Sequence, residues 1–296
     1  MKTKSVDMLV FQLLGYAIVA VAAVLSLIPV LVVLGSSFAS GDSLAEAGYR
    51  IIPRSFSIDG YRYIFAVAGG ILRAYGITTF SMVTGTASSL FFTSMGSYVL
   101  WRKDFPWRNG FAFFFYFTTL FSGGLVPWYI LYVRYLHIKE LPLLAVTLPY
   151  LFSVFNLLII RNFLKSIPDA IVESAKIDGA GDFLIYRKLI LPLSKPGIAS
   201  IGLFVGLAYW NDWFLSYIFI SEKSEFIQLQ FYLYKMHSSV QVANDIGAAA
   251  GLSLGDMPTD TARMAMTVIV IGPIVFLYPL LQPFFIKGLT IGAVKG

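Results

Sequence analysis

Residues 169–192 read DAIVESAKIDGAGDFLIYRKLILP and stand apart from the rest of the chain. Over all 296 residues only 13% are charged and 57% are hydrophobic, yet acids and bases recur here every few positions. A Gly-Ala-Gly run at 179–181 interrupts the passage. Because glycine accepts positive φ at little cost, this run predicts a sharp turn between two short helices.

The predicted helix–turn–helix has identifiable ends. Ser166 and Asp169 fit a capping box for the first helix, with Pro168 tolerated in the first turn. Asp182 is placed to cap the second helix, which Pro192 would close. Such a segment suits either insertion into a groove of a partner or an amphipathic position on a membrane surface. From these residues alone, both interpretations stay open.

The flanking sequence is typical of a polytopic membrane protein. A helix needs roughly 20 apolar residues to cross a bilayer, and long unalternating runs are not barrel strands. We therefore predict an all-α chain that forms one transmembrane domain, residues 1–296. Its six predicted transmembrane helices lie at about 9–34, 74–100, 110–133, 143–164, 197–220 and 264–286. The apolar run from 8 to 34 is too long for a typical signal peptide, so it is predicted to be a retained first span.

Loop charge predicts the orientation of these spans. With a cytoplasmic N-terminus, the cytoplasmic side receives 13 of the 22 lysines and arginines, in short segments. In the link after the second span, Arg102, Lys103 and Arg108 oppose only Asp104. A basic excess in short loops marks the cytoplasmic side. We expect both termini and residues 161–196, which contain the charged passage, in the cytoplasm.

Composition excludes several classes of site. The chain has no cysteine and only two histidines, His137 and His237, which are far apart in the sequence. Disulfides, thiolate metal sites and histidine metal sites are therefore not expected. No Walker-type phosphate loop occurs, and no soluble basic face for nucleic acid is visible. We expect no catalytic residues, no metal and no cofactor on this chain.

The charged passage carries a family pattern. Its residues resemble the EAA loop of ATP-binding-cassette import permeases, roughly E-A-A-x-x-D-G-A, then an aromatic residue and a closing I-x-L-P. The matching positions are Glu173, Ser174, Ala175, Asp178, Gly179, Ala180, Tyr186 and Pro192. Ser174 stands for the second alanine and Tyr186 for the usual phenylalanine. The resemblance favours the groove-inserting interpretation and implies a cytoplasmic coupling element between spans four and five.

Other stretches resemble the same family. "AYWNDWFLSYIFI" (208–220) and "LLQPFFIKGLTIGAVKG" (280–296) are similar to carbohydrate-uptake permeases related to the second permease of the maltose system. "FSGGLVPWYIL" (121–131) and "FSVFNLLIIRNFLKSIPD" (152–169) resemble the lplC-type and alginate-importer subgroup. This subgroup is associated with complex or uronic-acid-containing oligosaccharides.

The resemblance implies an assembly in the bacterial cytoplasmic (inner) membrane. A second homologous permease would pair with this chain as a heterodimer, surrounded by membrane lipid. Two ATPase subunits carrying ATP and Mg would dock beneath it, and an extracytoplasmic solute-binding protein would deliver the oligosaccharide. The resemblance also implies that the tail, with Lys295 and Gly296, reaches the interface of the ATPase dimer.

A possible substrate path lies in the fifth span, since polar groups within a span are functional candidates. Gly202, Gly206, Tyr209, Trp213 and Ser216 are spaced to share one helix face. The candidate path residues are Tyr209, Trp210, Asn211, Asp212, Trp213 and Ser216. Aromatic faces beside polar groups suit sugars. Alternatively, Asn211 and Asp212 satisfy backbone groups where the helix bends.

Two other classes of membrane protein fit the sequence less well. An ion-coupled secondary transporter often shows internal repeats or intramembrane acid–base relays. No repeat is visible, and Asp212 is the one acid placed inside a predicted span. An intramembrane enzyme needs paired catalytic groups at bilayer depth, and none is evident. The leading prediction is a non-catalytic permease subunit; the identity and length of the sugar do not follow from the sequence.

Overall fold

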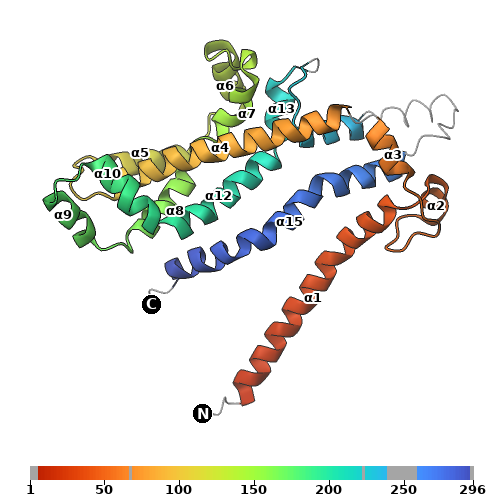
Figure 1. The fold of residues 1–296 in the computed structure, drawn as a ribbon, viewed down its shortest axis with the longest axis horizontal. Helices are drawn as coiled ribbons and strands as arrows, with labels where there is room; N and C mark the ends of the chain where they lie inside the picture. Colours follow the sequence, from red (N-terminus) through yellow and green to blue (C-terminus); the bar gives the residue numbers. More distant parts are fainter. Residues whose placement is uncertain (1–5, 67–68, 222–223, 239–258, 294–296) are drawn as a thin grey trace. The chain divides into compact units, whose positions relative to one another are not determined.

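The computed structural model describes residues 6–66, 69–221, 224–238 and 259–293, and helices dominate these ranges (Figure 1). Within them, the one β feature is an isolated antiparallel bridge between Ala39 and Phe56. The all-α prediction is confirmed. Two compact units divide the chain: residues 1–70 with 233–273, and residues 71–232 with 274–296.

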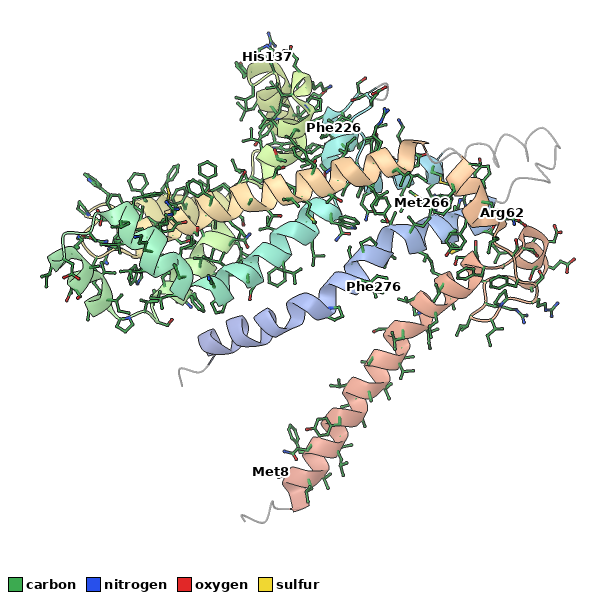
Figure 2. The ribbon with its side chains drawn as sticks, in the orientation of Figure 1. Met8, Arg62, His137, Phe226, Met266 and Phe276 are labelled. Atoms are coloured by element: carbon green, nitrogen blue, oxygen red, sulfur yellow. The ribbon has the colours of Figure 1, made fainter. Side chains whose placement is uncertain are left out.

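The first unit contains α1 (Val6–Ser37), α2 (Gly41–Ala47), α3 (Asp59–Ala66) and the start of α15 (Thr259–Ala293). Nearly every side chain of α1 between residues 8 and 31 is exposed, and most are apolar (Figure 2). This helix is long and apolar enough to cross a membrane and contains the predicted first span. At its end, a Cβ on Gly35 would lie 2.0 Å from the carbonyl oxygen of Ile51, so only glycine permits this approach.

The second unit packs around one main core. Its long helices are α4 (Gly69–Trp101), α5 (Arg108–Leu120), α8 (Val154–Leu164) and α12 (Lys195–Trp210). The core gathers buried side chains from α4, α8, α12 and residues 167–190. They are Tyr98, Trp101, Ile160, Leu164, Ile167, Val172, Ile185, Tyr186, Ile190, Ile201, Val205 and Tyr209.

Three predicted spans of this unit are not single helices. The span at 110–133 divides into α5 and α6 (Leu125–Ile130), and α6 continues as a π-helix to Tyr135. The helix axis bends by 115° between α5 and α6. Gly124 at the break has a φ of 82°, a conformation that suits glycine. The span at 143–164 divides into α7 (Pro142–Thr147), with its 3₁₀ turn, and α8, which meet at 50°. The span at 197–220 ends its first helix at Trp210, and α13 (Phe214–Phe219) follows.

These breaks create a second, smaller cluster. Ile138, Ala145, Val146, Leu215, Phe219 and Ile220 are buried together, with aromatic side chains of α6 and the π-helical turn around them. Figure 1 shows α6, α7 and α13 grouped on one side of α4, and Figure 2 places His137 at the tip of this group.

Among the described residues, α1 is the one single helix long and apolar enough to qualify as a span, and up to five spans result if each of four bent helix pairs counts as one. The predicted sixth span, 264–286, lies within α15. The structure therefore shows a helical, multi-span architecture, and the count of six stays a prediction.

Candidate functional site

The elbow segment, residues 166–192, folds as two helical arms joined by a tight turn, as the sequence predicts. α9 (Asp169–Ile177) is the first arm. The second begins with α10 (Asp182–Ile185) and continues through a π-helical stretch into α11 (Leu191–Leu193), so that it ends one residue after Pro192.

Backbone hydrogen bonds close the elbow, residues 178–181. Gly179 has a φ of 80°, and its N–H donates to the carbonyl of Lys176 at 3.0 Å. The N–H of Ala180 donates to the carbonyl of Ala175 at 2.9 Å. This pair of bonds is a Schellman motif, which needs a left-handed residue after the helix cap. The predicted positive φ of Gly179 is confirmed.

Two predicted caps are wrong. The hydroxyl of Ser166 donates to the carbonyl of Phe163 at 2.7 Å, and α9 begins after Pro168 without a side-chain cap. Asp182 lies inside α10, and its carboxylate accepts a hydrogen bond from Arg102. The Asp178 carboxylate has no hydrogen bond within the described residues, so its backbone, and not its side chain, contributes to the turn.

The elbow segment has one buried face and one exposed face. Val172, Ile185, Tyr186 and Ile190 belong to the main core. The hydroxyl of Tyr186 also shares a buried 2.7 Å hydrogen bond with Ser94 of α4. On the outer face, Ile177 is 86% exposed and Phe183 is 60% exposed, beside exposed Glu173, Ser174, Asp178 and Gly179. Apolar side chains this exposed at a polar turn are suited to contact with a partner.

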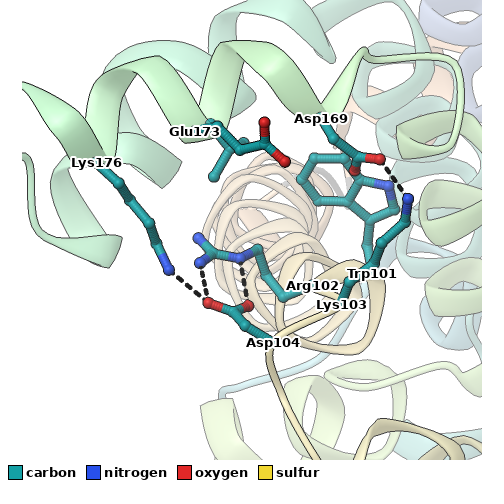
Figure 3. Close-up of a pocket in the computed structure, with 8 residues that line it drawn as sticks. Trp101, Arg102, Lys103, Asp104, Asp169, Glu173 and Lys176 are labelled. Atoms are coloured by element: carbon teal, nitrogen blue, oxygen red, sulfur yellow. Dashed lines mark hydrogen bonds and ion pairs between the residues drawn. The ribbon is translucent and has the colours of Figure 1, made fainter.

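An ionic clamp holds both arms to the loop that follows α4 (Figure 3). The clamp consists of Arg102, Lys103, Asp104, Asp169, Lys176 and Asp182. The guanidinium of Arg102 donates to both oxygens of Asp104, at 2.8 and 2.5 Å, and to Asp182 at 2.9 Å. Asp104 also accepts from Lys176 at 2.5 Å. The pair of Lys103 with Asp169 fixes the first turn of α9.

Arg102 is the buried centre of the clamp. Its side chain is 9% exposed, and it also donates to the hydroxyl of Tyr98 at 2.6 Å. Bidentate pairing with a carboxylate is among the stronger hydrogen-bonded arrangements. One guanidinium at the end of α4 thus contacts α10 directly and α9 through Asp104. A cavity of about 180 Å³ lies between this loop and α9, lined by clamp residues, Trp101, Val172 and Glu173.

The Arg102–Asp104 pair of the clamp stays charged near neutral pH. Hydrogen bonds from Arg102 and Lys176 hold the pKa of the Asp104 carboxyl well below its usual range. The hydrogen bond to Asp104 in turn raises the pKa of Arg102. A carboxyl with a lowered pKa stabilises the fold above its unfolded pKa and loses that effect only as the pH falls through the folded value. The stabilising effect of this pair is therefore fully present at neutral pH and is lost only in strong acid.

Residues 105–291 match the family described as "Binding-protein-dependent transport system inner membrane component". The chain belongs to this permease family. The elbow segment and its exposed face lie within the matched range. As a transport permease, the chain is a non-catalytic subunit, which confirms that prediction, and the family carries no cofactor on this subunit. Among the described residues, no cluster of acids or histidines is arranged to hold a metal ion.

Individual relatives include a permease of a polysaccharide transport system. The permease is 35% identical to "Polygalacturonan/rhamnogalacturonan transport system permease protein YtcP" of Bacillus subtilis (strain 168), over 97% of this chain and 98% of the relative. It is equally similar to Protein LplC of the same organism, over 97% and 95%. It also resembles, with a TM-score of 0.82 and 27% identity, a chain of a crystal structure of "a bacterial ABC transporter involved in the import of the acidic polysaccharide alginate". That match covers 96% of the permease and 100% of the solved chain. The predicted resemblance to ABC carbohydrate importers of the lplC and alginate type is confirmed.

Most of the predicted path residues of the permease are buried. Tyr209 is fully buried, its hydroxyl donates to the carbonyl of Thr147 at 2.8 Å, and its ring fills the space beside Gly85. Trp210 is 4% exposed, and the hydroxyl of Ser216 donates to Gln228 at 2.7 Å. The predicted stripe does not continue on one helix, because α12 ends at Trp210.

Asp212 of the permease acts at the break between α12 and α13. It is 4% exposed, and one carboxylate oxygen accepts from the Tyr150 hydroxyl at 3.2 Å and from the Leu215 N–H at 3.3 Å. This geometry supports the structural alternative for Asp212, namely that it satisfies backbone groups at a bend. Asn211 and Trp213, by contrast, remain exposed.

Two features of the permease were not predicted. The clamp residues of the loop after α4 were interpreted only as orientation signals, although an acid amid several bases is also a signal for ion pairing. The break at 121–124 borders a cavity of about 780 Å³ lined by Thr118, Thr119, Phe121, Ser122, Trp128 and Phe214, among others. The Gly-Gly pair inside an apolar run was the available signal, because interrupted spans point to binding sites in transporters.

Lys295 and Gly296 lie outside the described residues.

Proposed function

We propose that this chain is one of two membrane-spanning subunits of an ATP-driven oligosaccharide importer, and that the exposed elbow docks in a cleft of an ATPase subunit. The observation that supports this docking is the contrast between the two faces of the elbow segment. Its inner face is buried in the core and held by the clamp, whereas Ile177, Phe183 and the left-handed Gly179 face outward. A rigidly based, exposed apolar turn is suited to insertion into a partner's groove.

The proposed substrate is an acidic, uronic-acid-containing oligosaccharide, such as one from alginate, delivered by a solute-binding protein. The support comes from two similar proteins, one a permease of a polygalacturonan/rhamnogalacturonan transport system and the other a chain of a transporter involved in the import of the acidic polysaccharide alginate. The cavity at the α5–α6 break adds hydroxyls and aromatic rings, the groups that sugars contact. We propose that this cavity and the exposed Asn211 and Trp213 contribute to the path, while Tyr209, Trp210, Asp212 and Ser216 position them from the interior.

The proposed topology has six spans. Both termini and residues 161–196 lie in the cytoplasm. The lysine and arginine bias of the short loops supports this orientation. The proposed partners are a second homologous permease, two ATPase subunits carrying ATP and Mg, and the binding protein. The tail with Lys295 and Gly296 is proposed to contact the ATPase dimer.

Reconstitution tests the assignment as a whole. The chain, assembled in proteoliposomes with a second permease, ATPase subunits and a binding protein, is expected to take up oligogalacturonate or alginate oligosaccharide only with ATP. The chain alone is expected to hydrolyse no ATP. Uptake driven by an ion gradient without ATP would instead establish a secondary transporter. A neutral oligosaccharide of equal length is the control: preference for it would retain the importer and exclude the acidic substrate.

Introduced cysteines test the topology and the path, because the native chain has none. Ile177→Cys should resist an impermeant thiol reagent in intact cells and react after permeabilisation, whereas Ile52→Cys, 80% exposed in the first predicted outer loop, should react at once. Labelling of position 177 from outside would reverse the orientation. In the assembled complex, Trp213→Cys should react more slowly when substrate and binding protein are present. An unchanged rate there would remove Trp213 from the path.

A further inference from the structure

We propose that the basic pocket binds the phosphodiester head group of an anionic phospholipid in the cytoplasmic leaflet. This pocket has a volume of about 330 Å³ and is lined by Trp101, Lys103, Arg108, Asn109, Arg161, Lys165, Ile167 and Asp169. Its placement on the cytoplasmic side rests on the proposed topology. The volume lies within the range of small-ligand pockets.

The charge of the basic pocket is strongly unbalanced. Four basic side chains and one carboxylate line it, and that carboxylate, Asp169, is already paired with Lys103. Across the described parts of the chain, Arg108, Arg161 and Lys165 form no ion pair with an acid. Three cations gathered without a counter-charge repel one another, so an anion between them is favoured.

Backbone geometry adds to this attraction. Arg108 is the first residue of α5, and the cap residue Trp107 forms no side-chain hydrogen bond with the helix. The N–H of Arg108 itself donates to the carbonyl of Phe105 at 3.3 Å, so the next N–H groups of the first turn, together with the helix dipole, are those that favour a phosphate. Arg161 is held in place by a hydrogen bond from its Nε to the carbonyl of Leu100 at 3.0 Å. This bond involves only Nε, so the two terminal nitrogens of the guanidinium are available to an acceptor.

The surroundings of the basic pocket indicate a lipid as the source of the phosphate. Trp101 and Ile167 give the pocket an apolar wall. At its rim, Trp107, the residue before α5, is 70% exposed, and α5 continues with exposed aromatic side chains that include Phe111 at 48% and Phe113 at 67%. Exposed tryptophan at a span end is typical of the membrane interface, and basic pockets between spans on the cytoplasmic side bind anionic head groups. A lipid would cover the pocket with its head group and α5 with its acyl chains, whereas a free anion would cover only the pocket.

The bound lipid would join three helix ends. α4 ends at Trp101, α5 begins at Arg108, and α8 ends next to Lys165. Because Lys103 and Asp169 belong to both the pocket and the ionic clamp, the head group would lie beside the base of the elbow segment. The lipid composition of the membrane would therefore affect the ion pairs of the clamp.

The test compares lipid retention in complete complexes that have first been shown to hydrolyse ATP, so that a failure to assemble is recognised separately. Complexes are reconstituted in phosphatidylcholine containing a minor share of phosphatidylglycerol, washed with detergent, and their retained phospholipids are measured by mass spectrometry. The variant Arg108→Gln/Lys165→Gln removes two pocket cations. Lys188→Gln/Lys195→Gln removes two exposed cations from the same predicted side and is the matched control.

We expect wild type and the control to retain phosphatidylglycerol above its share in the mixture, and the pocket variant to bind it roughly 25-fold more weakly. Each cation near an anionic lipid strengthens binding about fivefold. Added inorganic phosphate should not displace the lipid. Equal retention by the pocket variant and the control, or no enrichment in wild type, would overturn the proposal. Displacement by inorganic phosphate would show a free-anion site and would also overturn it.

Discussion

Gly179→Val is expected to abolish uptake and the stimulation of ATP hydrolysis by the loaded binding protein. Valine at a φ of 80° suffers backbone strain of about 1–3 kcal/mol, and the Schellman motif loses its left-handed residue. Within the chain a Cβ at this position meets nothing within 4 Å, so strain is the only internal cost. Any loss beyond it arises where the elbow meets its partner. Insertion of the spans should survive, because the proposed elbow lies outside the lipid.

Two matched variants separate backbone strain from contact. Gly181→Ala adds one methyl group to the same elbow, where φ is −71° and no atom lies within 4 Å, and it should leave transport intact. Gly179→Asn keeps a residue that tolerates positive φ but adds bulk. If asparagine restores coupling, conformation is what matters; if it fails like valine, close approach to the ATPase matters. Undiminished uptake by Gly179→Val in the reconstituted complex would contradict the proposed docking role.

Arg102→Met is expected to uncouple the importer, with uptake per ATP hydrolysed falling roughly tenfold. The change removes the group that holds both arms of the elbow segment. It leaves the Tyr98 hydroxyl and the Asp182 carboxylate without their donor, and Asp104 with Lys176 alone. Hydrogen bonds to charged groups contribute about 1.5–3 kcal/mol each when buried. Asp104 and Asp182 are 52% and 69% exposed, which reduces that figure. If the free energy of the clamped arrangement rises by about 1.4 kcal/mol, its equilibrium population falls tenfold, which is enough for the expected effect.

The measurement for Arg102 is the ratio of uptake to ATP hydrolysis, since a general loss of assembly lowers both equally. Arg102→Lys keeps the charge but not the planar fork, so an intermediate ratio is expected. Arg187→Met removes an exposed arginine from the second arm, with no ion pair in the described chain, and is the control. A wild-type ratio in Arg102→Met would mean that the clamp is not needed to position the elbow. Because the Arg102–Asp104 pair stays charged at neutral pH, its contribution to the ratio should not change between pH 6 and 8.

Local features of the fold were predictable because their causes are local. Gly179 shows this, since a helix ending within a Gly-Ala-Gly run needs a left-handed residue whatever surrounds it. The two mispredicted caps have different causes: the Ser166 hydroxyl bonds back to the preceding turn, at Phe163, whereas a distant residue competes for the Asp182 side chain. Asp182 binds Arg102, which is 80 residues away in the sequence, and no local pattern indicates this pairing.

The contrast between local and distant causes also explains which parts of the predicted path in the fifth span could be predicted. Hydropathy detects an apolar run but not whether one helix or two pass through it, so the break after Trp210 entered only through the alternative in which the helix bends at Asn211 and Asp212. Asp212 was correctly singled out as an unusual acid, but its neighbours Tyr150 and Leu215 had to be known before it could be assigned to a helix end. The Gly123-Gly124 pair was a local signal for the bend at α5, and it was not used.

The two carboxylates of Arg102 become available at different times during synthesis. Asp104 leaves the ribosome two residues after Arg102, so the guanidinium has a counter-charge from the start. Asp182 follows 80 residues after Arg102, which at about 5–20 residues per second means roughly 4–16 seconds later. During that interval α5 and α8 are synthesised while the loop after α4 is already neutralised in part. Asp182 completes the pairing only after α8 has been made, so the clamp cannot close before α4, α5 and α8 have all left the ribosome.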